Sequence, residues 1–196
     1  IAILQLMETA PPEIPRYTLY AGRDEIGKPS VLAGYGDTGF GDTGVDLDVS
    51  ESIIKRAGLN RIEDFFDDRE LEIGFDFDSG DEAHNAFPIV GADSDLGFGK
   101  DEVLTSNGDS GGPVFVDGSI AGVTAFNAWL TESDFNDTFD QSWGEVGFAT
   151  RVASFQDFIP TATNGEAVFV PEPSNSFQIW SMILVVSLTS RLRVRL

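Results

Sequence analysis

Short apolar runs separated by glycine, proline and charged residues dominate this chain, and they predict strands joined by turns. Leu71–Phe77 shows the clearest pattern, because apolar and polar residues alternate along it as on a half-buried strand. The other segments expected as strands are Ile1–Leu6, Tyr17–Gly22, Ser30–Gly36, Val114–Val116, Ile120–Phe126 and Val146–Ala149. Charged Arg23–Lys28 is expected as the turn between the second and third of them, and Gly36–Gly44 as an exposed glycine loop.

Two segments carry a helical pattern. Ser50–Leu59 has a capping serine at its start and Gly58 near its end. Arg151–Ile159 places its apolar side chains on one helical face, and Pro160 is expected to end that helix. Since strands outnumber helices, the pattern predicts an all-β protein, a barrel or a sandwich.

The composition excludes several classes of functional site and of binding partner. The 196 residues are 41% hydrophobic, which is enough for a packed core. With no cysteine and one histidine, the chain has no disulfide framework, no thiolate nucleophile and no cysteine-ligated or multi-histidine metal centre, so neither a metal nor a cofactor is expected. A net charge of -21, from 12 basic and 33 acidic residues, argues against a nucleic-acid partner.

The acidic surface itself admits three interpretations: solubility through self-repulsion, adaptation to a salty medium, or calcium binding. Asp76, Asp78, Asp81 and Glu82 lie close together in the sequence, as calcium ligands do. However, Gly80 falls at the fifth position of an EF-hand frame and Phe87 stands where the closing glutamate belongs. The segment is therefore interpreted as a solvated loop.

The sequence Asn107-Gly-Asp-Ser-Gly-Gly-Pro113 carries the strongest chemical signal. A serine nucleophile needs an exposed hydroxyl and backbone N–H groups directed at the developing oxyanion. Gly108 and Gly111 permit the backbone dihedrals that such a loop requires, and Asp109 can anchor it through an internal ion pair. A plain turn would use the same residue types.

Gly108-Asp-Ser-Gly-Gly-Pro113 resembles the active-site serine motif of the trypsin/chymotrypsin-like serine proteases. Two later stretches also resemble this family: Ile120–Asn127, its strand beside the substrate, and Val146–Val152, its last strand and the start of its C-terminal helix. Leu32–Gly36 is similar to the family's Gly-Trp-Gly strand. The resemblance implies the second six-stranded barrel of a two-barrel fold, followed by a C-terminal helix.

The resemblance implies acyl transfer to Ser110, with the N–H groups of Gly108 and Ser110 as the oxyanion hole and Asp109, Gly111 and Gly112 as structural residues of the loop. The family's order is His, Asp, Ser, and its aspartate precedes a strand like Ile1–Leu4. The histidine and aspartate are therefore expected upstream of Ile1. His84 falls inside a loop of the second barrel, where the family's order gives it no catalytic role.

Substrate-binding positions follow from the same resemblance. Leu104 falls six residues before the serine, at the base of the P1 pocket, and Gly147 leaves a wall of that pocket open. An apolar base favours apolar or uncharged P1 residues. Ala125, Phe126 and Asn127 replace the family's Ser-Trp-Gly beside the substrate backbone.

The C-terminal segment combines Pro171-Glu172-Pro173, a mainly apolar stretch and three arginines. Ser174–Ser190 is at the lower edge of the roughly 17–25 residues that cross a bilayer. This order resembles the PEP-CTERM sorting signal of Gram-negative bacteria, which implies an exported protein with a transient membrane anchor, a short hydrophobic helix and processing by an exosortase-type enzyme. A packed core helix is the alternative.

We therefore expect residues 1–160 to be the C-terminal part of a trypsin-like peptidase domain, 161–169 a linker and 170–196 the sorting segment. The leading hypothesis is an exported serine-type endopeptidase acting on proteins or peptides. The chain as given, without the upstream triad residues, is expected to be inactive. A non-catalytic surface or matrix-binding protein that keeps the protease-like fold is the second hypothesis, and a calcium-binding acidic module the third.

Overall fold

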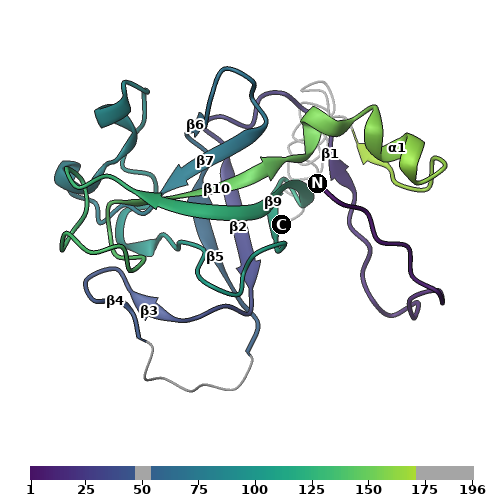
Figure 1. Cartoon of the computed structure of the whole chain (residues 1–196), viewed down its shortest axis with the longest axis horizontal. Helices are drawn as coiled ribbons and strands as arrows, with labels where there is room; N and C mark the ends of the chain where they lie inside the picture. Colours follow the sequence, from purple (N-terminus) through teal and green to yellow (C-terminus); the bar gives the residue numbers. More distant parts are fainter. Residues whose placement is uncertain (47–53, 171–196) are drawn as a thin grey trace, which may run out of the picture.

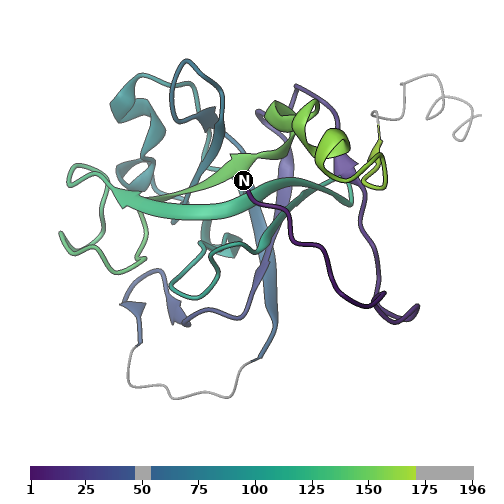
Figure 2. The same cartoon turned by 45° about the vertical axis from the view of Figure 1, so that its right-hand side comes forward.

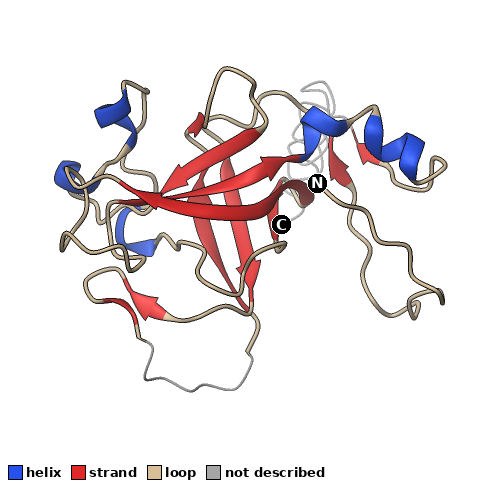
Figure 3. Cartoon of the chain, viewed as in Figure 1, coloured by secondary structure: helices blue, strands red, loops and turns tan. Residues whose placement is uncertain are grey.

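The computed structural model describes residues 1–46 and 54–170, and this part of the chain is mostly β with few helices (Figure 1). Its main sheet is largely antiparallel, with the strand order β5-β2-β8-β9-β10-β7-β6, and it curls into half of a barrel (Figure 3). The strands of this path are β2 (Pro29–Gly34), β5 (Arg56–Arg61), β6 (Asp64–Phe65), β7 (Glu72–Asp76), β8 (Pro113–Val116), β9 (Ser119–Trp129) and β10 (Glu145–Arg151).

The described ranges contain four further strands of two residues each: β1 (Leu19–Tyr20), β3 (Gly39–Phe40), β4 (Gly44–Val45) and β11 (Phe169–Val170). β3 and β4 form a hairpin of their own within the segment expected as a glycine loop. β1 pairs in parallel with β11 and with the start of β9. Residues 161–169, expected as a linker, thus lead directly into a strand of the main sheet.

Most of the strands expected from the sequence are present. Each of Ser30–Gly36, Leu71–Phe77, Val114–Val116, Ile120–Phe126 and Val146–Ala149 contains or overlaps a strand. β2 shows the reason, because Ser30 and Leu32 are buried while Pro29 and Val31 are exposed, as alternation on a half-buried strand requires.

The main core lies inside the curl of the sheet. It unites Ile62, which follows β5, with side chains from β1, β2, β7, β8, β9 and β10: Tyr20, Leu32, Ile73, Phe75, Val114, Val116, Ala121 and Ala149. A second, smaller apolar cluster of Ala86, Phe87, Val146 and Phe148 packs where β10 meets the loop after β7. Alternate residues of β2 and β8 are buried, whereas most residues of β7 and β10 are buried on both faces.

The predicted strand Ile1–Leu6 is wrong. These residues belong to no strand and are exposed, and the N-terminal stretch projects away from the sheet in Figure 1. A short apolar run forms a strand only where a partner edge is available, and no described strand pairs with residues 1–6.

The predicted helix Ser50–Leu59 is also wrong in its described part, residues 54–59. β5 begins at Arg56 and pairs antiparallel with the whole of β2, from Gly34 opposite Arg56 to Pro29 opposite Arg61. Six residues of long-range pairing thus outweigh the local helical pattern. The start of the predicted helix, residues 50–53, lies outside the described residues.

The chain after β10 forms two short helical turns instead of one helix. A 3₁₀ turn, η4 (Val152–Phe155), is followed by the five-residue helix α1 (Phe158–Ala162), both beside β1 in Figure 2. Pro160 does not end this helix. It sits in its first turn, where a missing N–H removes no intrahelical hydrogen bond.

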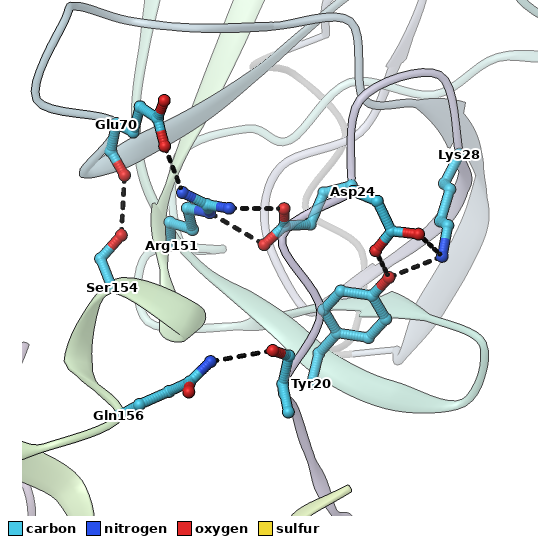
Figure 4. Close-up of polar contacts among 9 residues, drawn as sticks. Tyr20, Asp24, Lys28, Glu70, Arg151, Ser154 and Gln156 are labelled. Atoms are coloured by element: carbon cyan, nitrogen blue, oxygen red, sulfur yellow. Dashed lines mark hydrogen bonds and ion pairs between the residues drawn. The ribbon is translucent and has the colours of Figure 1, made fainter. Parts of the chain in front are cut away.

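A buried ion pair fastens the end of β10 to the loop between β1 and β2 (Figure 4). Arg151 Nε and Nη2 donate to the two carboxylate oxygens of Glu25, each at 2.8 Å, and Nη1 donates to Glu70 at 2.9 Å. Glu25 is 0% and Arg151 2% exposed. The predicted turn Arg23–Lys28 therefore exists, but one of its charges belongs to the interior.

Among residues 1–46 and 54–170, no helix is long and apolar enough to cross a membrane. The Pro171-Glu172-Pro173 motif and the hydrophobic segment after it lie outside the described residues.

Candidate functional site

The loop that leads into β8 carries the serine motif. Gly108 has φ +96° and Gly111 φ +83°, in the left-handed region that favours glycine. These two glycines determine the backbone conformation on either side of Asp109 and Ser110. The loop conformation thus follows from the glycines of the motif.

Asp109 holds the loop against the end of β2. Its Oδ1 accepts a hydrogen bond from the N–H of Gly36 at 2.7 Å, and its Oδ2 accepts one from the N–H of Ser106 at 2.9 Å. A Cβ at Gly34 would overlap this carboxylate, so the close approach depends on that glycine. The expected internal ion pair is absent within the described residues, because backbone N–H groups take the place of a basic side chain.

Backbone N–H groups along the loop alternate between paired and unpaired. The N–H of Asp109 donates to Ser106 O at 3.0 Å, and that of Gly111 donates to Thr124 O at 2.9 Å. Within residues 1–46 and 54–170, the N–H groups of Gly108 and Ser110 donate to no protein atom. The two unpaired donors belong to the residues expected to form the oxyanion hole.

Ser110 is exposed, and its hydroxyl forms no hydrogen bond within the part of the chain that the structure describes. Gly112 continues the loop into the sheet, since its carbonyl accepts the N–H of Thr124 at 2.9 Å. The serine is thereby fixed at the start of β8, next to β9.

The residues expected to contact the substrate gather around β9 and β10. A Cβ at Gly147 would lie 3.0 Å from Leu104 Cδ1, so the two expected pocket residues are neighbours. Asn127 Nδ2 donates to Thr105 O at 2.5 Å, and Thr105 Oγ1 donates to Asn127 Oδ1 at 3.0 Å. These bonds tie β9 to the segment that precedes the serine loop.

β9 has a free edge beside the serine loop. Its pairing with β8 ends at Val123, while its pairing with β10 continues to Trp129. Ala125 and Phe126 lie in this stretch, and the Phe126 ring is stacked on Phe148 at 5.0 Å. No described strand pairs with this side of β9 beyond Val123, so an extended peptide has an edge on which to add a strand.

A cavity of about 700 Å³ adjoins the inner side of the loop. Asp109 and Leu104 line it together with the end of β2 and the β3–β4 hairpin, and Trp143 forms part of its wall. Ser110 and Gly147 are not among its lining residues. The cavity thus lies behind the serine, on the side of the Asp109 carboxylate.

His84 belongs to a different part of the molecule. It ends the 3₁₀ turn η1 (Glu82–His84), its Nδ1 is 2.6 Å from Ser79 Oγ, and its ring stacks on Trp143 with centroids 6.5 Å apart. Phe135 packs edge-on against it. The imidazole is therefore occupied by local contacts, as expected for a loop histidine.

The interpretation of Asp76–Glu82 as a solvated loop is wrong for its first half. Asp76 and Asp78 are 1% and 0% exposed, whereas Asp81 and Glu82 are exposed. Glu63, on the chain before β6, lies with the two buried aspartates, and sequence reasoning did not single it out. Asp76 and Asp78 are two residues apart at the end of a strand, which places both side chains on one face. This spacing is the sequence feature that could have indicated the cluster.

Neither a protein-family profile nor a curated protein matches this chain. Among solved structures it is similar to neuropsin, a serine protease expressed in the limbic system of mouse brain, with a TM-score of 0.48 and 13% sequence identity. The match covers 79% of this chain and 56% of neuropsin, so the chain spans little more than half the length of that protein.

Proposed function

We propose that the chain is the C-terminal part of an exported serine-type endopeptidase of the trypsin-like class, with the six-stranded second barrel and C-terminal helix of that fold. One observation carries the proposal: the unpaired N–H groups of Gly108 and Ser110 flank an anchored Asp109 and an exposed serine hydroxyl. An oxyanion hole needs this set of donors.

In the proposed reaction, Ser110 Oγ attacks the carbonyl carbon of the scissile peptide, and its proton passes to a histidine supplied by chain upstream of Ile1. The carbonyl oxygen becomes an oxyanion that accepts hydrogen bonds from the N–H groups of Gly108 and Ser110. The C–N bond then breaks, the amine leaves with the proton, and water hydrolyses the acyl-enzyme. Losing one oxyanion donor of this kind costs about 10²–10³ in rate.

Substrate binding follows from the β9 edge. An extended peptide pairs beside Ala125, Phe126 and Asn127, and its P1 side chain points toward Leu104 and Gly147. No carboxylate stands at Leu104 to hold an arginine or lysine side chain. We therefore propose a preference for apolar or uncharged P1 residues.

A panel of peptide substrates that differ only at P1 tests this assignment in the full-length product. The wild type should cleave peptides with apolar P1 residues, and Ser110→Ala should abolish cleavage. Leu104→Asp should gain activity toward lysine or arginine. A strict lysine or arginine preference in the wild type would refute the role of Leu104.

A non-catalytic surface or matrix-binding protein with this fold is the second candidate. It is favoured by the contacts of the single histidine, which pairs with Ser79 and the rings of Phe135 and Trp143. The sequence encoded upstream of Ile1 separates the two candidates. An aspartate adjoining Ile1 and a histidine further upstream support the enzyme.

The proposal includes export and sorting. Pro171-Glu172-Pro173 would be recognised by an exosortase-type processing enzyme, the apolar segment after it would form a transient membrane anchor, and the arginines would keep the C-terminus on the cytoplasmic side. A Gram-negative bacterium is the proposed source.

A further inference from the structure

Three carboxylates meet inside the protein on the loop side of β7, among residues the peptidase reaction does not use. Glu63, Asp76 and Asp78 each direct one oxygen into a common space, and these oxygens lie within 4.8 Å of one another. The side chains come from two separate segments of the chain. Their exposed fractions are 4%, 1% and 0%.

The fold positions these side chains independently of any ligand. Asp76 ends β7 and Asp78 follows two residues later, so strand alternation directs both to the same face. Glu63 is brought alongside because its N–H donates to Gly74 O at 2.9 Å. Asn60, itself 1% exposed, donates to Asp76 O at 2.6 Å and fixes the end of the strand.

Most of the carboxylate oxygens have no protein partner. Asp76 Oδ2 accepts the N–H of Ala86 at 2.7 Å, but no N–H or hydroxyl group of the described residues donates to Asp76 Oδ1, to either oxygen of Asp78 or to either oxygen of Glu63. Glu63 and Asp76 can hydrogen-bond to each other only when one of them is protonated. Within the described ranges, no lysine or arginine forms an ion pair with any of the three. Buried charges are normally paired or bound to a metal, so these groups need a partner that the protein does not supply.

Without a bound cation, these groups hold protons. Burial, then a hydrogen bond with the Asp76 side chain and the charges of the neighbouring carboxylates, raises the pKa of Glu63 to about 10. Burial and the neighbouring carboxylates raise the pKa of Asp78 to about 8. Nearby Glu102 uses its two oxygens as acceptors for the N–H groups of Asp78 and Phe98. It therefore holds the loop that carries Asp78 in place, as the outer residues of a metal site do.

We propose that Glu63, Asp76 and Asp78 bind one Ca²⁺ ion. Calcium takes carboxylate oxygens at about 2.3–2.6 Å in flexible geometry, so two ligands on opposite sides of the ion are about 4.6–5.2 Å apart. The oxygens of this cluster fit within that span. Mg²⁺, at about 2.0–2.1 Å, demands a tighter octahedral arrangement.

A small cavity lies beside Glu63, and Asp76 and Asp78 are not among its lining residues. Its volume is about 210 Å³, and Glu63, Asp93 and Asp95 are among the residues that line it. Asp93 and Asp95 are exposed at this cavity, and Arg61, which also lines it, forms an ion pair with Asp95 at 3.3 Å, so the charge of Asp93 is the one left to attract a cation.

The competing account is a proton shared between carboxyl groups, with no metal. The two accounts predict different behaviour for Asp78→Asn, which keeps the shape of the side chain and removes its charge. With a calcium site, the variant loses its response to Ca²⁺. In metal-free buffer it should melt higher than the wild type under either account, because a buried unpaired carboxylate is gone.

The experiment combines calorimetric titration of the full chain with thermal melting, in chelator-treated buffer at about physiological salt, with added Ca²⁺ or Mg²⁺. The wild type should bind one Ca²⁺ at this site, and a concentration 100-fold above the dissociation constant should raise Tm by about 5–11 °C. Asp78→Asn and Glu63→Gln should lose both effects. The control Glu82→Gln, which removes an exposed acidic charge nearby, should keep them.

Three results would overturn the proposal. A folded wild type that binds no Ca²⁺ would favour the shared proton. Binding that persists in Glu63→Gln or Asp78→Asn would place the ion on the acidic surface. A response to Mg²⁺ that equals or exceeds the response to Ca²⁺ would contradict the assignment of the ion. If either variant fails to fold, the binding stoichiometry and the ion preference of the wild type still distinguish a calcium site from a shared proton.

Discussion

Replacing Asp109 by asparagine should loosen the serine loop, and the structure sets the size of the effect. The carboxylate accepts two backbone N–H groups, from Gly36 at 2.7 Å and Ser106 at 2.9 Å. Asparagine can accept only one of them with its oxygen, and its NH₂ group then faces the other N–H. A hydrogen bond to a charged acceptor contributes about 1.5–3 kcal/mol, and an unpaired N–H costs about 1–3 kcal/mol.

Asp109→Asn should therefore lower the free energy of unfolding by about 2.5–6 kcal/mol unless the loop rearranges, which would reduce the loss. Urea unfolding followed by tryptophan fluorescence measures it, since Trp143 lines the same cavity as Asp109. Amide exchange at Gly36 and Ser106 should accelerate in the variant. Asp101→Asn, at an exposed position, is the control and should change stability by less than about 0.5 kcal/mol.

Gly34→Ala tests the same contact from the other side, because its Cβ would overlap the Asp109 carboxylate and displace it. It should reproduce the faster exchange at Gly36. An unfolding free energy for Asp109→Asn within about 1 kcal/mol of the wild type, with unchanged amide exchange, would show that Asp109 does not hold the loop.

Three further predictions concern the sheet and the tail. Glu25→Gln should lower the free energy of unfolding by about 3–5 kcal/mol, because it leaves Arg151 buried beside a neutral partner. Glu70→Gln, at a side chain 51% exposed, should lower it by less than about 1 kcal/mol in the same urea assay. Burial raises the pKa of Glu145 to about 7, above its ordinary value of 4.5, so its contribution to stability is present below pH 4.5 and lost as pH rises through 7. The difference in free energy of unfolding between the wild type and Glu145→Gln should therefore change by about 3 kcal/mol over that pH range. A difference that does not change with pH would contradict the raised pKa. Deleting residues 171–196 should leave Tm nearly unchanged and release the protein from the membrane fraction, whereas aggregation of the truncated chain would refute the sorting-signal proposal.

The sequence predicted the strands whose own side chains alternate, and it located the serine loop. β2 could be recognised in this way because its buried and exposed positions follow a period of two. β7 could be recognised because apolar and polar residues alternate in its sequence, although Ile73–Asp76 are all buried. β5 could not, since its strand conformation comes from pairing with β2. Local pattern alone does not report which distant edge is available.

Buried charge was the other feature that the sequence did not reveal. Glu25 lies within a run of charged residues that predicts a turn, and its partner Arg151 is 126 positions away. Asp76 and Asp78 belong to a chain with 33 acidic residues, in which a solvated position is the ordinary expectation. Only the fold shows which carboxylates it encloses.

Reaction of Ser110 with a serine-directed phosphonate tests whether this serine is the nucleophile. The full-length product should gain one covalent adduct by intact-mass measurement, with the modified peptide mapping to Ser110. Ser110→Ala should gain none, and Ser106→Ala, a nearby serine outside the proposed reaction, should be labelled like the wild type. A folded full-length protein that stays unlabelled, or a Ser110→Ala variant labelled as fast as the wild type, would contradict the account.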